Sequence, residues 1–454
     1  MSNDTLSEQE QKANMEKYYA MEEELLRPLK KVSWGARIWI ALLIIVCLNG
    51  LYCYTLQLKH GLVVTGLRDY ASWGMYISNF VFFVAISLVG ALISSILKLT
   101  HFEWFRPLTR IAEIIAVAAI TFAGLIIIID MGRPDRVLNL FIHGRIQSPI
   151  MWDVIVVTTY LITGVLLLYL PLLPGLAICR DRLTEKPKWQ RWMYKTLALG
   201  WEGSPEQWKI MKRSVNILCV LVIPLAVSIH TVTAWLFATT LRPGWNSTNF
   251  GPYFVAGAFL AGTACVIVGM AAFRKFYHLE KYITDVHFNH MGKLMVFLCI
   301  IYTYFNVNEY LVPAYKMETA EAKLLNDLFT GRTAPIYWFS QIFGMGLPAI
   351  LLIFKKMRKP LPLTIMAVFV VVGAWLKRYI IVTPIMLHPY LPIQNTPASW
   401  TTYIPTWIEM SIVAASLSGV LLIITLFARF FPIISIWEVA EGEGIEIEHI
   451  HDKR

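Results

Sequence analysis

The chain has 454 residues, of which 57% are hydrophobic and 15% are charged, and its formal net charge is +10. A soluble domain carries about 25% charged residues, so this composition excludes an ordinary soluble protein and indicates a polytopic membrane protein. The Lys and Arg residues gather in the loops between apolar segments, which is typical of membrane topology and not of a nucleic-acid-binding surface.

The sequence begins with a polar, acidic segment that lacks the basic start of a signal peptide, and we predict a helix outside the bilayer over residues 7–31. Ten apolar segments follow, each long enough to cross about 30 Å of hydrocarbon. The expected spans are 36–56, 71–97, 110–130, 151–173, 214–240, 253–273, 291–313, 335–354, 362–387 and 408–431.

This pattern predicts an all-α integral membrane protein with ten transmembrane helices. Spans two to five and six to nine can form two four-helix bundles, with the first and last spans as two flanking helices. We expect three regions along the chain: a cytoplasmic polar segment over 1–35, a ten-helix membrane domain over 36–431 and an acidic cytoplasmic tail over 432–454.

An even number of spans places both ends of the chain on one side of the membrane. The loops on that side hold far more Lys and Arg than the opposite loops, so the positive-inside rule predicts cytoplasmic termini. The largest loop on this side, near 174–213, is expected to lie on the membrane surface because it carries four tryptophans. They are Trp189, Trp192, Trp201 and Trp208.

The six cysteines show no C-x-x-C, C-x-x-C-H or ferredoxin-like spacing. We therefore expect no covalent haem, no iron–sulfur cluster and no metal site in this chain.

Polar and ionisable residues recur inside five of the expected spans. Lys377 and Arg378 stand in the middle of the apolar run 362–387, where a cation costs roughly 3 kcal/mol or more and is usually functional. With the predicted orientation, the polar residues of spans three, four, five, seven and nine all fall in the outer half of the membrane. They include Asp130, Asp153, His230, Glu309, Tyr310, Lys377 and Arg378. One outward-facing polar cavity would bring them together.

Simpler interpretations exist for individual residues. Asp130 can form a structural ion pair with Arg133, because buried charges are normally paired, and Asp153 can do the same with Arg378. His230, with Ser and Thr residues beside it, can be a hydrogen-bonded core histidine.

Helix geometry and side-chain length bear on Glu309, Lys377 and Arg378. Glu309 and Lys377 can reach the membrane interface by snorkelling. Because adjacent helical residues point about 100° apart, Lys377 and Arg378 are not expected to face one ligand.

A quinone suits such a cavity. It is apolar and enters from lipid, its two carbonyl oxygens need hydrogen-bond donors, and its two-electron chemistry moves two protons through a nearby carboxylate or imidazole. A secondary transporter with charged groups near the membrane midplane is the alternative from another class.

At these residues the chain resembles the NrfD/polysulfide reductase C family, over nearly the whole membrane part. Within that family it looks most similar to the quinol-site membrane subunit of alternative complex III and to that of the Qrc menaquinone reductase. The matching stretches include DMGRP from Asp130, SPIMWDV from Ser148, SIHTVTAW from Ser228, YFNVNEY from Tyr304 and KRYIIVTP from Lys377.

The resemblance implies a multi-pass protein of the bacterial inner membrane with a quinone site, most naturally for menaquinone, near the periplasmic face. It also implies a periplasmic iron–sulfur subunit as the electron-transfer partner. Multihaem cytochrome c subunits and a second subunit of the NrfD type are further expected partners. The chain is expected to act as one subunit of an oxidoreductase and not as an enzyme by itself.

From these arguments we hypothesise that Asp153 and Asp130 exchange protons with the quinone head group, assisted by His230. Arg378 would orient Asp153 or stabilise a developing oxyanion. The remaining expected quinone-binding residues are Arg133, Trp152, Glu309, Tyr310 and Lys377.

The chain departs from the family pattern at three positions. Relatives often have His where this chain has Asp130, and they can have His at Leu88 and Asp at Leu236. These departures bear on a transmembrane proton path. They leave a structural or proton-conducting subunit without a working quinone site as an alternative.

Overall fold

The computed structural model describes residues 8–30, 32–100, 103–391 and 393–445. This part of the chain contains no β-strand, and ten of its helical segments are long and apolar enough to cross a membrane. The expected all-α integral membrane fold is therefore confirmed. The ten spans are α2 (Trp34–His60), α3 (Met75–Leu99), α4 (Thr109–Asp130), α6 (Pro149–Tyr169), α9 (Pro205–Ala238), α10 (Phe250–Phe276), α11 (Asp285–Lys316), the composite span of α13 (Ala334–Gln341), η5 (Ile342–Gly346) and α14 (Leu347–Leu351), α15 (Pro360–Leu387) and α16 (Trp407–Phe430).

The remaining helices lie outside these ten spans. They are α1 (Glu8–Lys30), η1 (Leu62–Val64), η2 (Glu103–Leu108), η3 (Pro134–Arg136), α5 (Asn139–Ile142), η4 (Leu170–Leu172), α7 (Leu173–Arg182), α8 (Lys188–Leu197), α12 (Thr319–Phe329), η6 (Lys355–Arg358), η7 (Ala398–Thr401) and α17 (Ile436–Gly442).

Capping residues determine where several spans begin. Pro149 occupies the first turn of α6, where a missing backbone N–H has no cost. The largest difference from the expected boundaries is at α9, which begins at Pro205 although the apolar run begins only near 214. The Oγ of Ser204 accepts the backbone N–H of Gln207 at 3.3 Å and so starts the helix earlier. Hydropathy alone does not detect this polar first part of α9.

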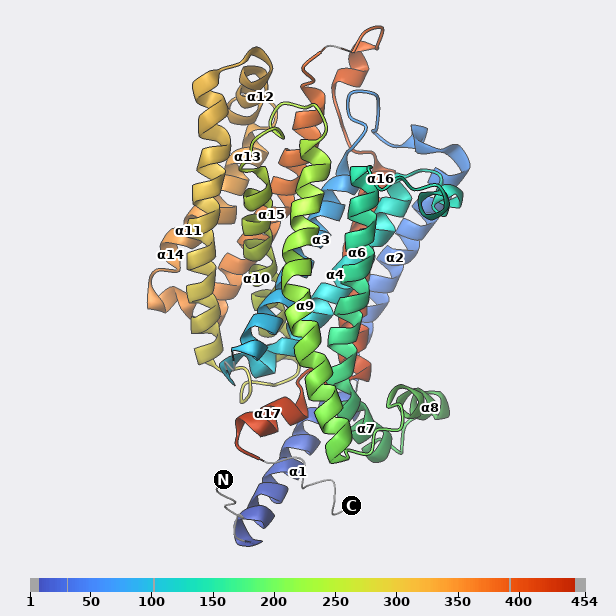
Figure 1. Cartoon of the computed structure of the whole chain (residues 1–454), viewed down its shortest axis with the longest axis vertical. Helices are drawn as coiled ribbons and strands as arrows, with labels where there is room; N and C mark the ends of the chain where they lie inside the picture. Colours follow the sequence, from blue (N-terminus) through green and yellow to red (C-terminus); the bar gives the residue numbers. More distant parts are fainter. Residues whose placement is uncertain (1–7, 31, 101–102, 392, 446–454) are drawn as a thin grey trace.

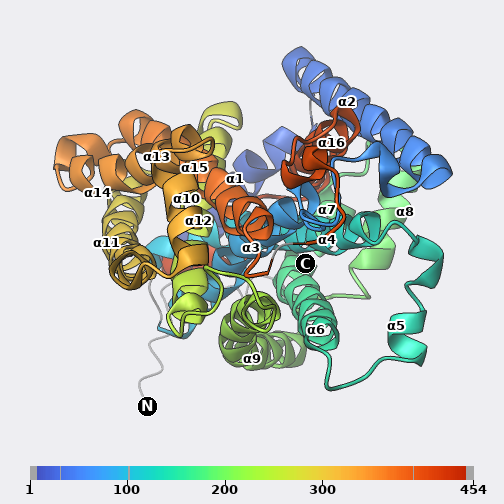
Figure 2. The same ribbon diagram turned by 90° about the horizontal axis from the view of Figure 1, so that it is seen from above.

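The spans form two four-helix bundles, as predicted. In the first bundle, α3, α4, α6 and α9 each pack against the next helix, and α9 packs against α3. In the second bundle, α10, α11, the α13–α14 span and α15 close in the same way. The flanking helices α2 and α16 pair with each other beside α4, and Figure 2 shows them together on the first-bundle side. Packing of α3 and α9 against α10 joins the two bundles.

Glycine permits close approach where α3 meets its two main neighbours. A Cβ on Gly90 would lie 2.0 Å from the carbonyl oxygen of Ala112 on α4. A Cβ on Gly262 of α10 would lie 2.4 Å from the side chain of Val89 on α3. Both crossings therefore need a residue without a side chain.

The helices α1, α7, α8 and α17 lie at one end of the molecule, which we call the terminal side, and α12 lies at the opposite end, the far side (Figure 1). The polar helix expected over 7–31 is present as α1, but it does not stand apart from the rest of the protein. Tyr18, Leu25 and Leu29 form a buried apolar face, and Arg182 pairs with Glu22 at 2.5 Å. This helix therefore packs against the terminal side of the membrane-spanning helices.

The tail also packs against the terminal side over its described part, while residues 446–454 lie outside the described residues. Arg110 of α4 donates to the carbonyl oxygens of Pro432 at 2.9 Å and Pro171 at 3.0 Å. Lys98 pairs with Glu113 at 2.9 Å and with Glu438 of α17 at 3.4 Å. Buried charges thus connect the first bundle to α17.

Candidate functional site

Asp153 is buried, with 3% of its surface exposed, one turn inside the far-side start of α6. Its Oδ1 accepts a 2.6 Å hydrogen bond from the hydroxyl of Thr233 on α9. Among the described residues Asp153 forms no ion pair, so the expected structural pair with Arg378 is not present. A carboxyl group held only by a hydroxyl is able to gain or lose a proton.

His230 lies three residues before Thr233 on α9, and residues at this spacing share one helix face. Its Nδ1 is 3.2 Å from the carbonyl oxygen of Ala226. Because that oxygen can only accept, Nδ1 carries the proton and Nε2 of the neutral ring is an acceptor. The buried Nε2 makes no hydrogen bond of good geometry with the described residues, although the backbone of Val84 on α3 lies near the ring. His230 is therefore only half satisfied as a core histidine.

Arg378 of α15 is 2% exposed and lies where the two bundles meet. Its guanidinium carbon lies 5.0 Å from the ring centroid of Phe254 on α10. The absent side chain of Gly257 leaves it room, since a Cβ there would lie 3.1 Å from Nη2. Its Nε and Nη1 find no acceptor in the described part of the chain, although its charge interacts with His230.

These groups lie at related depths in the far-side half of the spans. His230 and Arg378 stand eight and nine residues before the ends of α9 and α15, which corresponds to about 12 and 14 Å. Asp153 stands four residues after Pro149, or about 6 Å inside. The arrangement places a carboxyl group near the far-side surface, with an imidazole and a guanidinium group deeper inside.

Lys377 points into the second bundle, in agreement with the expected angle between it and Arg378. Its ammonium group donates to the hydroxyl of Tyr310 at 2.7 Å. The rings of Tyr253, Tyr310 and Tyr337 surround it at 5.8, 4.5 and 5.4 Å. Because Lys377 is 2% exposed and Glu309 is buried as well, neither snorkels to the interface.

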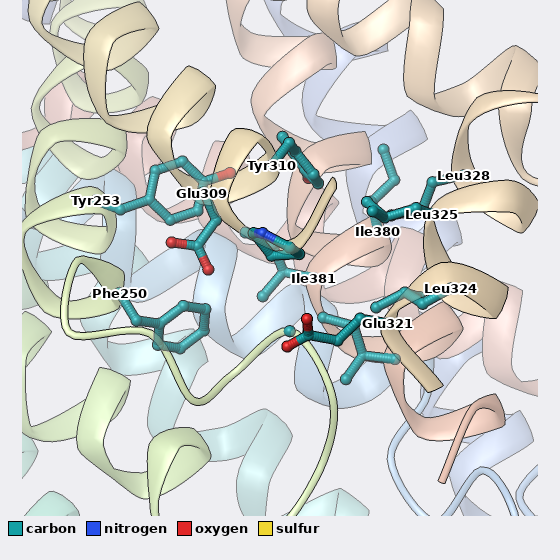
Figure 3. A pocket seen from close by; sticks show the side chains of 13 residues that line it. Phe250, Tyr253, Glu309, Tyr310, Glu321, Leu324, Leu325, Leu328, Ile380 and Ile381 are labelled. Atoms are coloured by element: carbon teal, nitrogen blue, oxygen red, sulfur yellow. The ribbon is translucent and has the colours of Figure 1, made fainter. Parts of the chain in front are cut away.

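Glu309 and Tyr310 line a cavity between α10, α11, α12 and α15, which we call the α12 cavity (Figure 3). Its volume of about 30 Å³ holds roughly two water molecules and is too small for a quinone ring. Glu309 accepts a 2.6 Å hydrogen bond from Ser247. Leu324, Leu325, Leu328, Ile380, Ile381 and Ile385 give the cavity a largely apolar wall. Glu309 and Tyr310 thus line a separate, water-sized space, and Lys377 is hydrogen-bonded to Tyr310 beside it.

Asp130, Arg133 and Trp152 do not join either group. Asp130 ends α4, and its charge interacts with that of Glu409 on α16. Arg133 is exposed and pairs with Asp135 at 3.1 Å, so the alternative pair with Asp130 is not formed. Trp152 is half-buried and donates its indole N–H to the carbonyl oxygen of Ile146. The seven polar residues expected in a single cavity therefore lie in three separate places. Asp153, His230 and Arg378 form one group, Glu309, Tyr310 and Lys377 form a second, and Asp130 lies apart from both.

Comparison with known proteins gives the family. The model of "Polysulphide reductase, NrfD" matches residues 63–388, which is most of the chain. This chain belongs to the NrfD family.

Relatives are similar over most of their length. The membrane component of a putative dimethyl sulfoxide reductase of Halobacterium salinarum is 30% identical over 71% of this chain and 70% of its own length. A component of the selenate reductase of Mesobacillus selenatarsenatis is 22% identical, over 92% and 99% of the two chains. The integral membrane subunit of menaquinone reductase of Nitratidesulfovibrio vulgaris is 24% identical, over 87% and 91%.

The NrfD match has a clear structural extent. It covers both four-helix bundles and ends at His388, directly after α15. Helices α1, α2, α16 and α17 lie outside it. All the expected site residues lie within the part of the chain that defines the NrfD family.

Proposed function

We propose that this NrfD-family protein is the quinone-binding membrane subunit of a respiratory oxidoreductase complex. The observation that carries the proposal is that the buried side chains of His230 and Arg378 lie within electrostatic reach of each other. Both side chains are buried, the guanidinium charge on α15 acts on the imidazole on α9, and each keeps ring or guanidinium nitrogen atoms without a partner in the described structure. A quinone oxygen supplies the acceptor that the guanidinium needs.

The reaction reduces a quinone with two electrons and two protons to the quinol, or runs in reverse. In our proposal Arg378 donates hydrogen bonds to a quinone oxygen and stabilises the negative charge that develops there. The acceptor Nε2 of His230 receives a hydrogen bond from the quinol hydroxyl. Asp153 exchanges protons between this position and the far side, because it lies nearer that surface and is held by Thr233.

The named relatives support the type of complex and suggest menaquinone. One relative from a menaquinone reductase and one from a selenate reductase match almost the whole of this chain. We propose an iron–sulfur subunit on the far side as the direct electron partner. Multihaem cytochrome c subunits and a second NrfD-type subunit would complete a complex similar to alternative complex III.

The orientation follows from charge. Lys and Arg residues are concentrated in the loops of the terminal side, so we propose that this side faces the cytoplasm of a bacterial inner membrane. The far side, with Asp153, Arg133 and Trp152, then faces the periplasm and the iron–sulfur partner. Arg133 and Trp152 would border the quinone entrance.

A proton-conducting role is the second candidate, and one observation favours it. The α12 cavity has room for water beside two buried carboxyl groups, Glu309 and Glu321, and Lys377 lies close to Glu309. We propose that Glu309, Tyr310 and Lys377 exchange protons with this water. Asp130 would be a further proton-exchanging group, in the first bundle.

The experiment that tests the proposed function is isolation of the chain with its native partners. We expect an iron–sulfur protein to co-purify, a quinone to appear in the organic extract, and a hydroxyquinoline N-oxide inhibitor to bind stoichiometrically with quenched fluorescence. A transporter would purify alone. A purely structural or proton-conducting subunit would bind neither quinone nor inhibitor, and either result would refute the proposal.

A further inference from the structure

The amphipathic helix α8 lies at the terminal-side edge of the membrane part. The hydroxyl of Tyr169 donates to the carbonyl oxygen of Leu197 at 2.5 Å, and the hydroxyl of Tyr194 donates to that of Phe430 at 2.8 Å. Tyr169 and Phe430 are the last residues of α6 and α16. Since the 21 residues of α6 span about 30 Å, this level corresponds to the edge of the hydrocarbon.

The same two hydrogen bonds define the direction of α8. They attach its C-terminal half to the ends of two different spans, and the ring of Trp189 near its start packs against Phe430 at 5.7 Å. The helix therefore runs along the membrane edge, and Figure 1 shows it near the level of the lower ends of α6 and α9.

One face of α8 is buried against the protein, and the rest of the helix is exposed. Gln190 and Tyr194 face the protein, whereas Trp189 and Trp192 are 56% and 69% exposed. Exposure is not a general property of this loop, because Trp201 is buried against Trp208 at 5.2 Å. Of the segment 174–213 that was expected to lie on the membrane surface, α8 is therefore the part whose tryptophans are exposed.

A basic stripe runs beside the two exposed indoles. Lys188, Arg191 and Lys195 are exposed and recur at three- and four-residue spacing, so they share one side of the helix. Within the described ranges none of the three forms an ion pair. By contrast, Lys186 just before them donates to the carbonyl oxygen of Leu29 at 2.7 Å.

We propose that α8 binds the phosphate head groups of anionic phospholipids in the terminal-side leaflet. The indoles would lie at the boundary of head groups and acyl chains, and the three cations would contact phosphate oxygens. This inference does not depend on the proposed quinone function.

The position of other tryptophans favours lipid over a soluble protein as the occupant. Trp34 and Trp39 of α2 are also exposed. The indole of Trp39 donates to the hydroxyl of Thr425 at 3.3 Å, five residues before the end of α16. The exposed indoles of α2 and α8 therefore stand near one level, as in the aromatic belt at a membrane interface.

The first test measures lipid binding by the purified full chain with its native partners. Bound phosphatidylglycerol is counted by native mass spectrometry during titration, with phosphatidylcholine as the neutral comparison. Each Lys or Arg near an anionic surface contributes about fivefold in affinity. We therefore expect the triple variant K188Q/R191Q/K195Q to bind phosphatidylglycerol at least about tenfold more weakly.

The matched control is K355Q/K356Q/K359Q, which removes three exposed cations from the connection between α14 and α15. This control should lose less affinity than the α8 variant, because these cations do not stand beside exposed indoles. Equal binding of phosphatidylglycerol by the wild type and the α8 variant would overturn the proposal, and so would equal wild-type binding of both lipids.

The second test locates the indoles. In nanodiscs made with phosphatidylcholine brominated near the head-group end of its acyl chains, Trp192→Phe should remove a component of the quenched tryptophan fluorescence. Trp201→Phe, which changes a buried indole of the same segment, should not. If the Trp192 signal is quenched by acrylamide but not by the brominated lipid, α8 faces water or a soluble partner and the proposal fails.

Discussion

Asp153 on α6 and Thr233 on α9 are joined by a 2.6 Å hydrogen bond between two buried side chains, about one turn inside the far side of the first bundle. The hydroxyl of Thr233 donates and the Oδ1 of Asp153 accepts. No other described residue forms a hydrogen bond or an ion pair with this carboxyl group. The pair therefore gives a direct way to change the buried carboxyl group without changing the packing.

The first prediction concerns this pair. Asp153→Asn keeps the shape but cannot take a proton, so quinol-coupled turnover of the intact complex should fall at least about a hundredfold. Thr233→Val removes one hydrogen bond to a charged group, and a smaller loss of about tenfold is expected. Thr231→Val is the control, because its hydroxyl donates only to the carbonyl oxygen of Val227 in its own helix. Wild-type turnover in Asp153→Asn would exclude this residue from the reaction.

The second prediction separates function from stability at Arg378. A buried cation without an anion destabilises the fold, so Arg378→Met should leave the unfolding midpoint unchanged or raise it. The same substitution should weaken binding of a hydroxyquinoline N-oxide inhibitor at least about tenfold, because a charged hydrogen-bond donor is lost. Thermal unfolding and inhibitor titration on one preparation measure both effects. A large loss of stability with unchanged inhibitor binding would make Arg378 a structural residue.

The third prediction tests the close contact of α3 and α4. A methyl group added in Gly90→Ala would meet the backbone of α4, and such overpacking costs roughly 1–3 kcal/mol. Gly124→Ala on α4 is the control, because nothing lies within 4 Å of its added Cβ. The unfolding midpoint in detergent should fall for Gly90→Ala and stay constant or rise slightly for Gly124→Ala. Equal midpoints would show that the two helices separate easily at this crossing.

The fourth prediction concerns the buried ion pair on the terminal side. The side chain of Glu113 is 2% exposed, and Lys98 neutralises it at 2.9 Å. Lys98→Met should therefore destabilise the protein by about 3–5 kcal/mol, because an uncompensated charge remains buried. The double variant Lys98→Met/Glu113→Gln should recover only part of that loss, because buried Glu438 also loses its ion pair with Lys98. Thermal unfolding of the two variants tests the coupling, and failure of the second change to restore stability would contradict it.

The sequence predicts much of this fold because hydropathy identifies the segments that cross the membrane, and the position of a residue within such a segment gives its depth. The ten spans and the far-side depth of His230 and Arg378 follow from this property. Rotation of a helix about its axis depends on its neighbours, and hydropathy carries little information about it. For this reason the polar residues that were expected to line one cavity lie in separate groups.

The missed partners illustrate the same limit. Tyr253 and Tyr337 stand in apolar runs, where an aromatic residue that packs in a core cannot be distinguished from one that surrounds Lys377. The role of Thr233 becomes visible only when α9 is placed against α6. The angle between Lys377 and Arg378 could be predicted, because it depends on helix geometry alone.

The docking of α17 bears on the order in which the protein is made. Arg110 is synthesised early, yet its acceptor at Pro432 and the partner of Lys98 at Glu438 leave the ribosome only after the last span. Until then the terminal side of the first bundle carries buried charges without all their partners. A chain that stops before α17 therefore lacks the ion pair between Lys98 and Glu438 that a finished chain has.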